Sequence, residues 1–563
     1  MSQSPKSMMY SGTKLIDALA KQYADRSQSE LFKSGVFTLA WRSKVGSFPH
    51  PDGETLVSAG EPCGAWNPSA SRPEDQRNLD QNLKLFKELP LHGYVPAASI
   101  RGIVRAWVSQ HPKLVVKMQE LLGHQAGAKM IAGKIEFLDA FPTKATKLTL
   151  DIANPQQDFQ VLHHGSASPS SLYTLGDGHQ QIEIKIGMRG RYPATAEDVA
   201  TVWAWLQQAL STQGVGSRTA SGYGAFTAPV GSTPSSDLPR LPVGSSSKKL
   251  NFTLYSQGSA GADPTIPELR PTHWRGWLRS WLMRFFLGVM EQADAETTVD
   301  ELWGSLNHKG VVRLQMKIDR MDPSRNTPKF YRWIGSFEIS APTDILNEII
   351  LPILKIAVRV GGVGRGWRRP LHRFRLEPKS GGKFDTARGC HLELTRSRAD
   401  VATNSTPTKL DLAGNNLNLI YAIWKDSVIN NWPDRYRENI PAINAEVFSP
   451  NTCAVYLVPE PYQNPIDPKT LNWILGETTA TRGRGMELIY QPKYKRKAEV
   501  GGDKSKCSWV SIKRVNGAKP EDPCQEVVCI FMGSQNRLRS DFLADLAKIP
   551  GGERLFGRTP SNL

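Results

Sequence analysis

The chain has 563 residues, more than one hydrophobic core usually contains, so we expect two or three domains. Hydrophobic residues make up 39% and charged residues 22%, as in a soluble globular protein, and no apolar run is long enough to span a membrane. The 70 Lys and Arg residues outnumber the 53 Asp and Glu residues, and this net charge of +17 favours a polyanionic partner. The N-terminus lacks the apolar core of a secretory signal, so we expect a cytoplasmic protein.

The positive charge is gathered in two segments. Residues 493–497 contain four cations, and residues 361–376 contain five arginines and no acid. Such clusters favour contact with phosphate groups over a uniformly solvated surface. The five arginines are Arg365, Arg368, Arg369, Arg373 and Arg375.

The six cysteines predict neither a disulfide framework nor a zinc site. Cys524 and Cys529 form the only close pair, and no second pair or histidine cluster accompanies them. We therefore expect buried free thiols.

An internal repeat is the strongest pattern in the chain. Residues 101–107 have the sequence RGIVRAW, and residues 275–281 have the sequence RGWLRSW. Each segment starts an apolar helical pattern, with Trp107 and Trp281 as expected core residues. The motif predicts two copies of one structural unit.

Later features repeat in the same order. Each copy continues with an apolar pair and a glycine, a strand, a helix and a glycine-rich loop. The order strand, helix, strand, strand, helix, strand is that of a ferredoxin-like unit, which predicts an α+β fold. In the first copy these features lie at 121–123, 133–138, 195–210 and 214–224. In the second copy they lie at 302–304, 311–318, 346–357 and 361–366.

These patterns predict the domain boundaries. We expect a first domain at 1–228, a linker rich in Pro, Ser and Gly at 229–247, and a second domain at 248–563. The repeat fades after residue 380, so residues 380–563 are an extension or an insertion of uncertain fold.

The glycines and arginines of the repeat suggest anion binding. A glycine-rich loop can present its N–H groups to phosphates, although the same glycines also suit a tight turn. Arg101 and Arg275 lie in the opening turns of helices, where the helix dipole also attracts anions. The alternatives are surface salt bridges for the arginines and a packing role for Gly102 and Gly276.

These motifs together resemble the RAMP superfamily of CRISPR-associated proteins. Residues 94–102 (YVPAASIRG) are similar to its Pro-Gly-Ser-Ser-hydrophobic-Lys/Arg-Gly signature, and residues 268–276 (ELRPTHWRG) resemble a divergent copy. Ala97 and Ala98 replace the usual Gly-Ser, so no serine contact is carried over there. The resemblance covers about 35–380.

The resemblance implies a fused double backbone subunit of a type III effector complex, similar to type III-D. It implies tandem ferredoxin-like domains with thumb hairpins, the first hairpin within 143–181. The implied partners are crRNA, target RNA, further RAMP backbone subunits and a large polymerase-like subunit. The implied RNA-binding residues are Arg101, Arg105, Gly214, Gly216, Arg218, Arg275, Arg279, Gly364, Arg365, Gly366, Arg368 and Arg369.

The resemblance also implies an endoribonuclease that cuts target RNA with an aspartate before the signature helix. Asp80 lies about where that aspartate is expected, and Asp263 is its counterpart in the second copy. Asp80 would hold Mg²⁺ or Mn²⁺, or orient the attacking 2′-hydroxyl. The alternative is a solvated residue or a helix cap. His163 and His164 lie in the expected thumb, where surface histidines are favoured over an acid–base pair.

Two other functions fit many of the same residues. One is a purely structural crRNA-binding scaffold without cleavage. The other is a guide-processing RAMP endoribonuclease, which usually has one C-terminal glycine-rich loop and a histidine near its N-terminus. This chain has two such loops, and its first histidine is His50. A protein with RNA recognition motifs would carry paired aromatics on central strands, and that pattern is not found.

Overall fold

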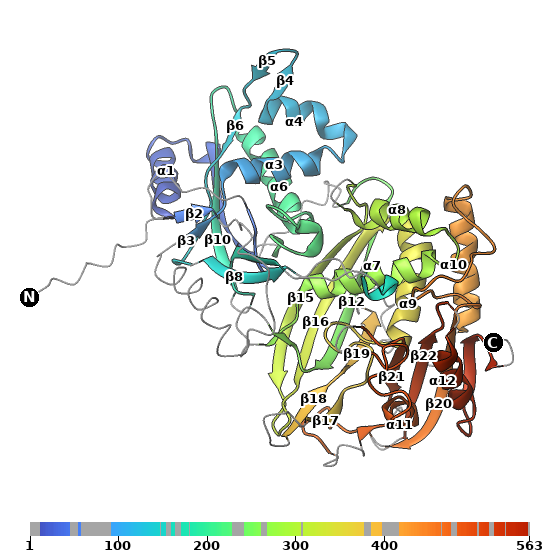
Figure 1. The fold of residues 1–563 in the computed structure, drawn as a ribbon. Coiled ribbons are helices and arrows are strands. Elements are labelled where there is room, and N and C mark those ends of the chain that lie inside the picture. Colours follow the sequence, from blue (N-terminus) through green and yellow to red (C-terminus); the bar gives the residue numbers. More distant parts are fainter. Residues whose placement is uncertain are drawn as a thin grey trace, which may run out of the picture. The chain divides into compact units, whose positions relative to one another are not determined.

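The computed structural model describes most of the chain, and it divides into two compact units. Unit 1 comprises residues 1–154 and 168–245, and unit 2 comprises residues 155–167 and 246–563 (Figure 1). No helix among the described residues has the length and apolar character needed to cross a membrane. The described residues are 12–45, 55–57, 92–146, 148–153, 159–163, 170–178, 181–227, 241–260, 267–305, 308–376, 384–396, 416–462, 464–474, 481–503, 506–516, 523–534 and 536–560.

Unit 1 contains an antiparallel sheet in the order β11-β1-β10-β6, with β7 also paired to β10. Counted along the chain, these four strands are the fourth, first, third and second, with one helix after the first and another after the third. We call this arrangement the first module. Its elements are β1 (Phe32–Leu39), α3 (Ala97–Val108), β6 (Ile135–Phe137), β7 (Phe141–Pro142), β10 (Ile182–Gly190), α6 (Ala196–Thr212) and β11 (Phe226–Thr227).

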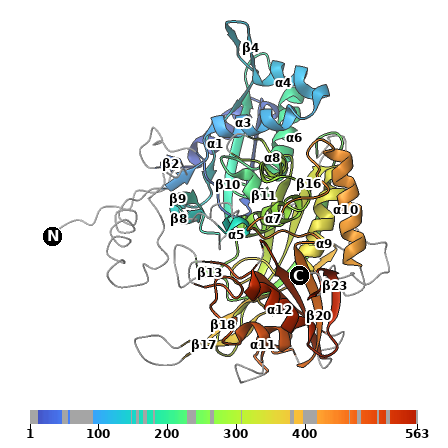
Figure 2. The same ribbon diagram turned by 45° about the vertical axis from the view of Figure 1, so that its right-hand side comes forward.

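Alternation of apolar residues explains the buried face of this sheet. In β10 every second residue from Ile182 to Met188 is buried. Helices α3 and α6 lie side by side in Figures 1 and 2 and share the core with the sheet. Trp107 and Trp205 are at most 1% exposed, so the prediction that Trp107 is a core residue is confirmed.

Smaller elements complete unit 1. The antiparallel hairpin β8–β9 lies inside the segment expected to form a thumb, and a second hairpin, β4–β5, follows α4. The elements are α1 (Lys14–Asp25), η1 (Ser29–Leu31), β2 (Thr55–Val57), β3 (His92–Tyr94), η2 (Pro112–Leu114), α4 (Val115–Leu122), β4 (His124–Ala126), β5 (Lys129–Ile131), β8 (Leu148–Ala153), β9 (Ser170–Leu175) and η3 (Thr219–Ser221).

Unit 2 contains a second sheet in the order β15-β16-β12-β19. Along the chain these strands are the second, third, first and fourth, which is the order of the first module read from the other edge. Helices again follow the first and third strands. This second module consists of β12 (Ser245–Ser256), α7 (Pro271–Phe286), α8 (Gln292–Trp303), β15 (Arg313–Pro323), β16 (Tyr331–Pro342), η4 (Ile345–Ile350), α9 (Leu351–Val360) and β19 (Cys390–Arg396).

A third sheet of the same order lies in the region whose fold the sequence left uncertain. It is antiparallel, in the order β21-β22-β20-β23, and its strands are again the second, third, first and fourth. We call this the third module. Its elements are β20 (Cys453–Tyr462), α11 (Arg484–Tyr490), β21 (Val510–Val515), β22 (Cys524–Phe531), α12 (Arg537–Ala547) and β23 (Glu553–Gly557).

The second and third modules share one hydrophobic core. The indole of Trp281 on α7 lies 6.1 Å from the ring of Phe531 on β22, and it is fully buried, as predicted for this residue. The other elements of unit 2 are α5 (Phe159–Leu162), β13 (Ser259–Ala260), β14 (Pro267–Glu268), β17 (His372–Leu376), β18 (Phe384–Arg388) and α10 (Leu417–Asn431).

Candidate functional site

The repeated Arg-Gly motif has a structural role in the first module. Arg101 donates a hydrogen bond to the carbonyl of Leu122, and Arg105 donates to the carbonyls of Leu122 and Gly123. Both carbonyls lie at the C-terminal end of α4, where cations stabilise the helix dipole. Two motifs that repeat in the sequence therefore contact each other in the structure.

The second module repeats this contact. Arg275 donates to the carbonyl of Trp303, and its guanidinium lies 5.3 Å from the centre of that indole ring. Arg279 donates to Asp300 at 2.7 Å. Burial and the neighbouring Arg279 and Arg313 lower the pKa of Arg275 to about 9. All four arginines of the two motifs have partners inside their own modules, and their contact with RNA stays a prediction.

Carboxylates occupy two of the helix N-termini that could attract a phosphate. Asp139 accepts a hydrogen bond from the backbone N–H of Ala97 at 2.7 Å, at the start of α3. Glu526 accepts from the N–H groups of Gly483 and Met486 at 3.2 and 3.1 Å, at the start of α11. A negative group therefore already satisfies these backbone donors.

In helix α3 of the first module, Gly102 lies on the exposed side. It is exposed, and a Cβ atom built on it would meet no atom within 4 Å among the described residues. Among the described residues, therefore, nothing packs against Gly102, although a glycine inside a helix costs roughly 0.5–1 kcal/mol relative to alanine. By contrast, a Cβ atom on Gly485 in α11 would lie 2.6 Å from Val528. The sequence motif alone does not separate these two roles.

The first glycine-rich loop is held by its own backbone. The N–H of Val215 donates to the carbonyl of Gly224 at 2.8 Å, and the N–H of Ser217 donates to Lys44 at 2.7 Å. Gly216 has a φ of 92°, and a Cβ atom there would overlap the carbonyl of Lys44. These glycines satisfy a tight turn. The N–H groups of Val215 and Ser217 are used inside the chain, and Arg218 is exposed beside them.

In the second glycine-rich loop, some arginines are buried and others are exposed. Gly364 and Gly366 both have a φ of 78°, and the exposed Arg365 lies between them. Arg369 donates to the carbonyl of Val510 at 2.6 Å and to Ser508 at 2.8 Å, which ties the loop to the third module.

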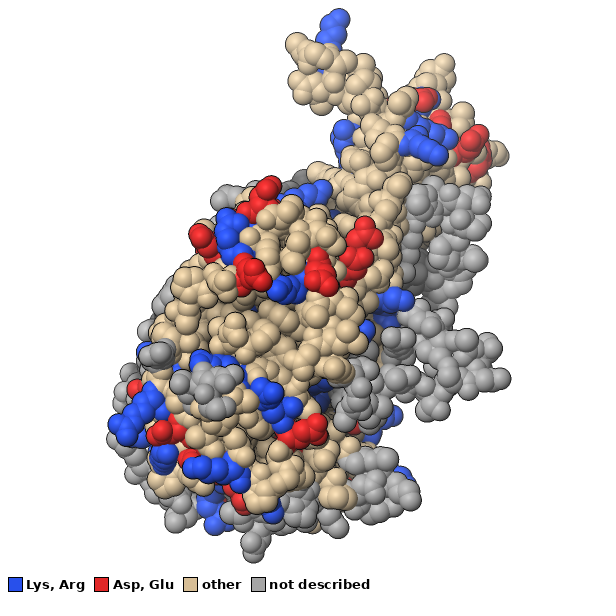
Figure 3. Space-filling view, turned by 90° about the vertical axis from the view of Figure 1, so that its right-hand side faces the viewer, with Lys and Arg blue, Asp and Glu red and all other residues tan. Residues whose placement is uncertain are grey.

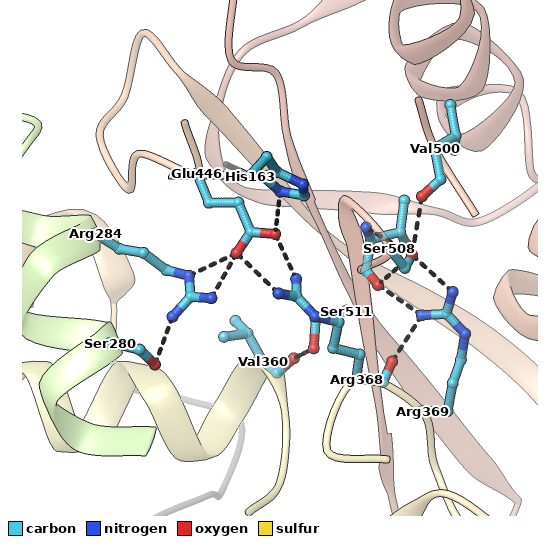
Figure 4. A network of polar contacts seen from close by, with 11 residues as sticks. His163, Ser280, Arg284, Val360, Arg368, Arg369, Glu446, Val500, Ser508 and Ser511 are labelled. Carbon is cyan, nitrogen blue, oxygen red and sulfur yellow. Dashed lines mark hydrogen bonds and ion pairs between the residues drawn. The ribbon is translucent and has the colours of Figure 1, made fainter. Parts of the chain in front are cut away.

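Arg368 of the same loop belongs to a buried ionic network (Figure 4). It donates to Glu446 at 2.7 Å, and Arg284 of α7 donates to the same carboxylate at 2.5 Å. His163 contacts Oε1 of the carboxylate at 3.0 Å, the same oxygen that Arg368 binds at 2.7 Å. Although burial opposes it, the attraction of Arg368 and Arg284 lowers the pKa of Glu446 to about 2.

His163 is not the surface residue that the sequence suggested. Its ring stacks on Trp509 at 3.9 Å, and only 2% of its side chain is exposed. The expectation was wrong because α5 (Phe159–Leu162), which directly precedes His163, packs into the hydrophobic core of unit 2. His164 lies outside the described residues.

A second group of cations stays at the surface of unit 2, and we call it the cationic cluster. Its members come from the second glycine-rich loop, from β18 and from the chain on both sides of α11. None of them forms an ion pair among the described residues, in contrast to Arg373 and Arg375, which bind Asp385. The members are Arg365, Arg388, Arg482, Lys495 and Arg496.

Ring contacts bring two of these cations together, because Arg388 lies over Phe374, Arg482 lies over Tyr490, and the centres of the two rings are 5.9 Å apart. The pKa of Arg388 is lowered by burial and, in addition, by the positive charges of Arg365 and Arg496. Figure 3 shows one face of the molecule, where many Lys and Arg side chains lie in the lower part with several Asp and Glu side chains among them. The sequence identified Arg365 and the run 493–497, but not Arg388 or Arg482, because each of these is a single arginine between other residue types.

The predicted catalytic residues Asp80 and Asp263 lie outside the described residues. Among the described part of the chain, no three His, Cys, Asp or Glu side chains are grouped so that they could hold a metal ion. Cleavage and its metal ion therefore stay predictions from the sequence.

No family model and no curated protein matches the chain. Among solved structures, the type III-B Cmr-beta complex bound to cognate target RNA contains a similar chain, with 16% identity and a TM-score of 0.25. The match covers 39% of this chain and 66% of that one. Cmr1 from Pyrococcus furiosus matches with 11% identity and a TM-score of 0.30, over 55% of this chain and 99% of that one.

Two further similarities belong to the same class. Cmr6 from Pyrococcus furiosus has 16% identity and a TM-score of 0.19, over 35% of this chain and 97% of that one. A type IV-B CRISPR complex contains a chain with 15% identity and a TM-score of 0.23, over 37% of this chain and 95% of that one. Of these four similar structures, three carry a Cmr name and one is named a CRISPR complex.

Proposed function

We propose that the chain is an RNA-binding backbone subunit of a CRISPR RNA-guided effector complex of type III. The observation that carries this proposal is the strand order shared by the three sheets, each with an Arg-Gly pair in the helix after its first strand. This order of strands and helices is that of a ferredoxin-like unit, and four-stranded sheets of this kind commonly bind RNA. Arg484-Gly485 of α11 is the third such pair.

In this proposal the chain is a fusion of three ferredoxin-like RAMP modules. The β8–β9 hairpin is the thumb of the first module, and crRNA with its target RNA is the ligand. The exposed Gly102 supports this assignment, because open space above a helix lets an RNA backbone approach closely. Other RAMP subunits and a large polymerase-like subunit would be its protein partners, as in type III-D-like assemblies.

Target cleavage is the enzymatic part of the proposal. It rests on the position of Asp80 relative to the signature at 94–102, with Asp263 as the counterpart in the second module. Arg101, Arg105, Gly214, Gly216 and Arg218 would follow the guide in the first module.

Co-expression with a repeat array and the other effector subunits tests the proposal. The purified assembly should contain RNA of discrete length that carries repeat sequence. A matched assembly without the array should contain no such RNA. An assembly that forms with the array but holds only heterogeneous cellular RNA would contradict guide binding.

A further inference from the structure

We propose that the cationic cluster is a binding site for successive phosphate groups of an RNA strand, at the junction of the second and third modules. This inference rests on the proposed function and deepens it, because none of the RNA-binding residues implied by the family resemblance lies after residue 369. The site consists of Arg365, Arg388, Arg482, Lys495 and Arg496.

Aromatic rings orient two of the guanidinium groups. The guanidinium carbon of Arg388 lies 3.8 Å from the ring centre of Phe374, and that of Arg482 lies 4.3 Å from the ring centre of Tyr490. A guanidinium held against a ring keeps its N–H edge free for another partner. Such an edge matches a phosphate through two parallel hydrogen bonds. The Nε atom of Arg482 is buried and has no hydrogen-bond partner among the described residues.

Tyr490 is itself held in place by a neutral histidine. The Nδ1–H of His372 donates to the carbonyl of Pro370 at 2.8 Å, so its Nε2 accepts from the Tyr490 hydroxyl at 3.1 Å. Burial, with contributions from nearby arginines, lowers the pKa of His372 to about 3. Tyr490 is therefore a positioning residue for Arg482, and the ammonium of Lys495 lies 5.9 Å from the centre of the same ring.

The free protein maintains this arrangement against repulsion. Tyr490 favours the charged form of Arg388, whereas Arg365 and Arg496 both disfavour it. No described acid forms an ion pair with any of these three cations. Arg496 also has a φ of 59°, a left-handed conformation that is unfavourable for residues other than glycine. A bound polyanion removes the repulsion, and strain of this kind is concentrated at functional sites. The site therefore gains most from a ligand with several phosphates.

The test compares two charge-matched variants of the full chain. In the first, Arg388→Gln, Arg482→Gln and Arg496→Gly remove three charges from the cluster, and glycine also suits the left-handed position. In the control, Lys249→Gln, Lys309→Gln and Lys469→Gln remove three exposed charges elsewhere in unit 2. A second cluster variant, Arg365→Ala with Arg496→Gly, changes only exposed residues and guards against misfolding.

Binding of a labelled single-stranded RNA oligonucleotide is measured over a series of salt concentrations. Each phosphate contact on a single strand contributes about 0.7 to the slope of log affinity against log salt. The triple cluster variant should lose about 2 units of slope and bind on the order of tenfold more weakly, whereas the control should stay close to wild type. The exposed pair should lose about 1.4 units.

The possible results distinguish a failure of the proposed cationic site from a failure of the proposed function. If the cluster variants and the control lose the same amount of salt-dependence slope, the protein binds RNA but the cluster is not a specific site. In that case the inference about the cluster is wrong, and the proposed function still stands. If the wild-type protein binds no RNA at physiological salt, both the inference and the proposed function fail. Poly-glutamate serves as the competing ligand, and equal or tighter binding that depends on the same arginines would assign the site to an acidic protein surface instead.

Discussion

At the scale of single residues, burial separates two kinds of arginine that look alike in the sequence. Arg368 and Arg365 are three positions apart in one loop, but Arg368 is buried against Glu446 and Arg365 is exposed. In the buried network the carboxylate of Glu446 lies between the guanidinium groups of Arg284 and Arg368. Its negative charge therefore compensates both buried positive charges. Charge density along the chain cannot distinguish these roles.

Glu446→Gln should therefore destabilise unit 2. It leaves Arg284 and Arg368 buried without their counter-charge, which costs about 3–5 kcal/mol of unfolding free energy. Chemical denaturation measures the loss. Glu301→Gln is the control, because its partner Arg435 is partly exposed and the change should cost at most about 1 kcal/mol. Equal losses in the two variants would contradict the role of the buried network.

The same carboxylate predicts a pH dependence. The pKa of Glu446 is lowered from 4.5 to about 2, so the folded state binds fewer protons than the unfolded state between these values. Its stabilisation is complete above about pH 4.5 and is lost as the pH falls towards 2. Unfolding free energies measured across this window should fall less steeply for Glu446→Gln than for the wild type. Parallel curves would show that Glu446 does not titrate in this way.

Asp80→Ala tests the proposed cleavage. Guide and target binding should stay nearly intact, since a metal-orienting carboxylate adds little to ground-state affinity. One cut in the target RNA should disappear, while cuts made by other subunits remain and require Mg²⁺ or Mn²⁺. Gel analysis of target fragments is the measurement, and wild-type products should end in 2′,3′-cyclic phosphate. An unchanged set of fragments would exclude Asp80, and the same result for Asp263 would favour the scaffold function.

At the scale of elements, helix α3 has a structural role, and the proposed function adds a binding role. Arg101 and Arg105 hold the end of α4, whereas Gly102 leaves an open position on the exposed side of the same helix. Gly102 has no packing partner among the described residues, so its helical cost has no structural gain there. We attribute it to the approach of RNA.

Gly102→Ala should raise stability and weaken guide binding together. Alanine stabilises an exposed helical position by roughly 0.5–1 kcal/mol, and its methyl group would narrow the space above the helix. Thermal unfolding and guide-RNA affinity are measured on the same sample. Ala106→Gly, on the same helix, should lower stability by a similar amount without changing RNA affinity. Unchanged affinity in Gly102→Ala would remove Gly102 from the proposed interface.

At the scale of the whole molecule, the net charge of +17 governs how the protein meets RNA. Lys and Arg release condensed counterions from phosphates, so affinity for single-stranded RNA should fall steeply between about 50 and 200 mM salt. Titrations at these two concentrations are the measurement. The same titration with a neutral oligonucleotide of equal sequence provides the control, and an affinity independent of salt would contradict phosphate binding.

The sequence alone determined the repeated motifs and the balance of charge. Short segments such as 101–107 and 275–281 carry a local pattern, and local patterns are readable without knowledge of distant contacts. The same reasoning located the core tryptophans and the second glycine-rich loop. It did not find the third module, because α11 has only seven residues and β20 contains Pro459 and Pro461.

The tertiary structure alone decided which of these charges are buried and which stand together at the surface. Glu446 meets Arg284 over 162 positions of sequence, and Arg388 approaches Arg496 over more than a hundred. Strand pairing between distant segments creates these neighbours, and no local propensity encodes them. Desolvation then separates paired interior charges from exposed ones, since a buried charge persists only with a partner. The sequence therefore shows where the cations lie along the chain, and the fold decides which of them are buried in a core network and which stay exposed.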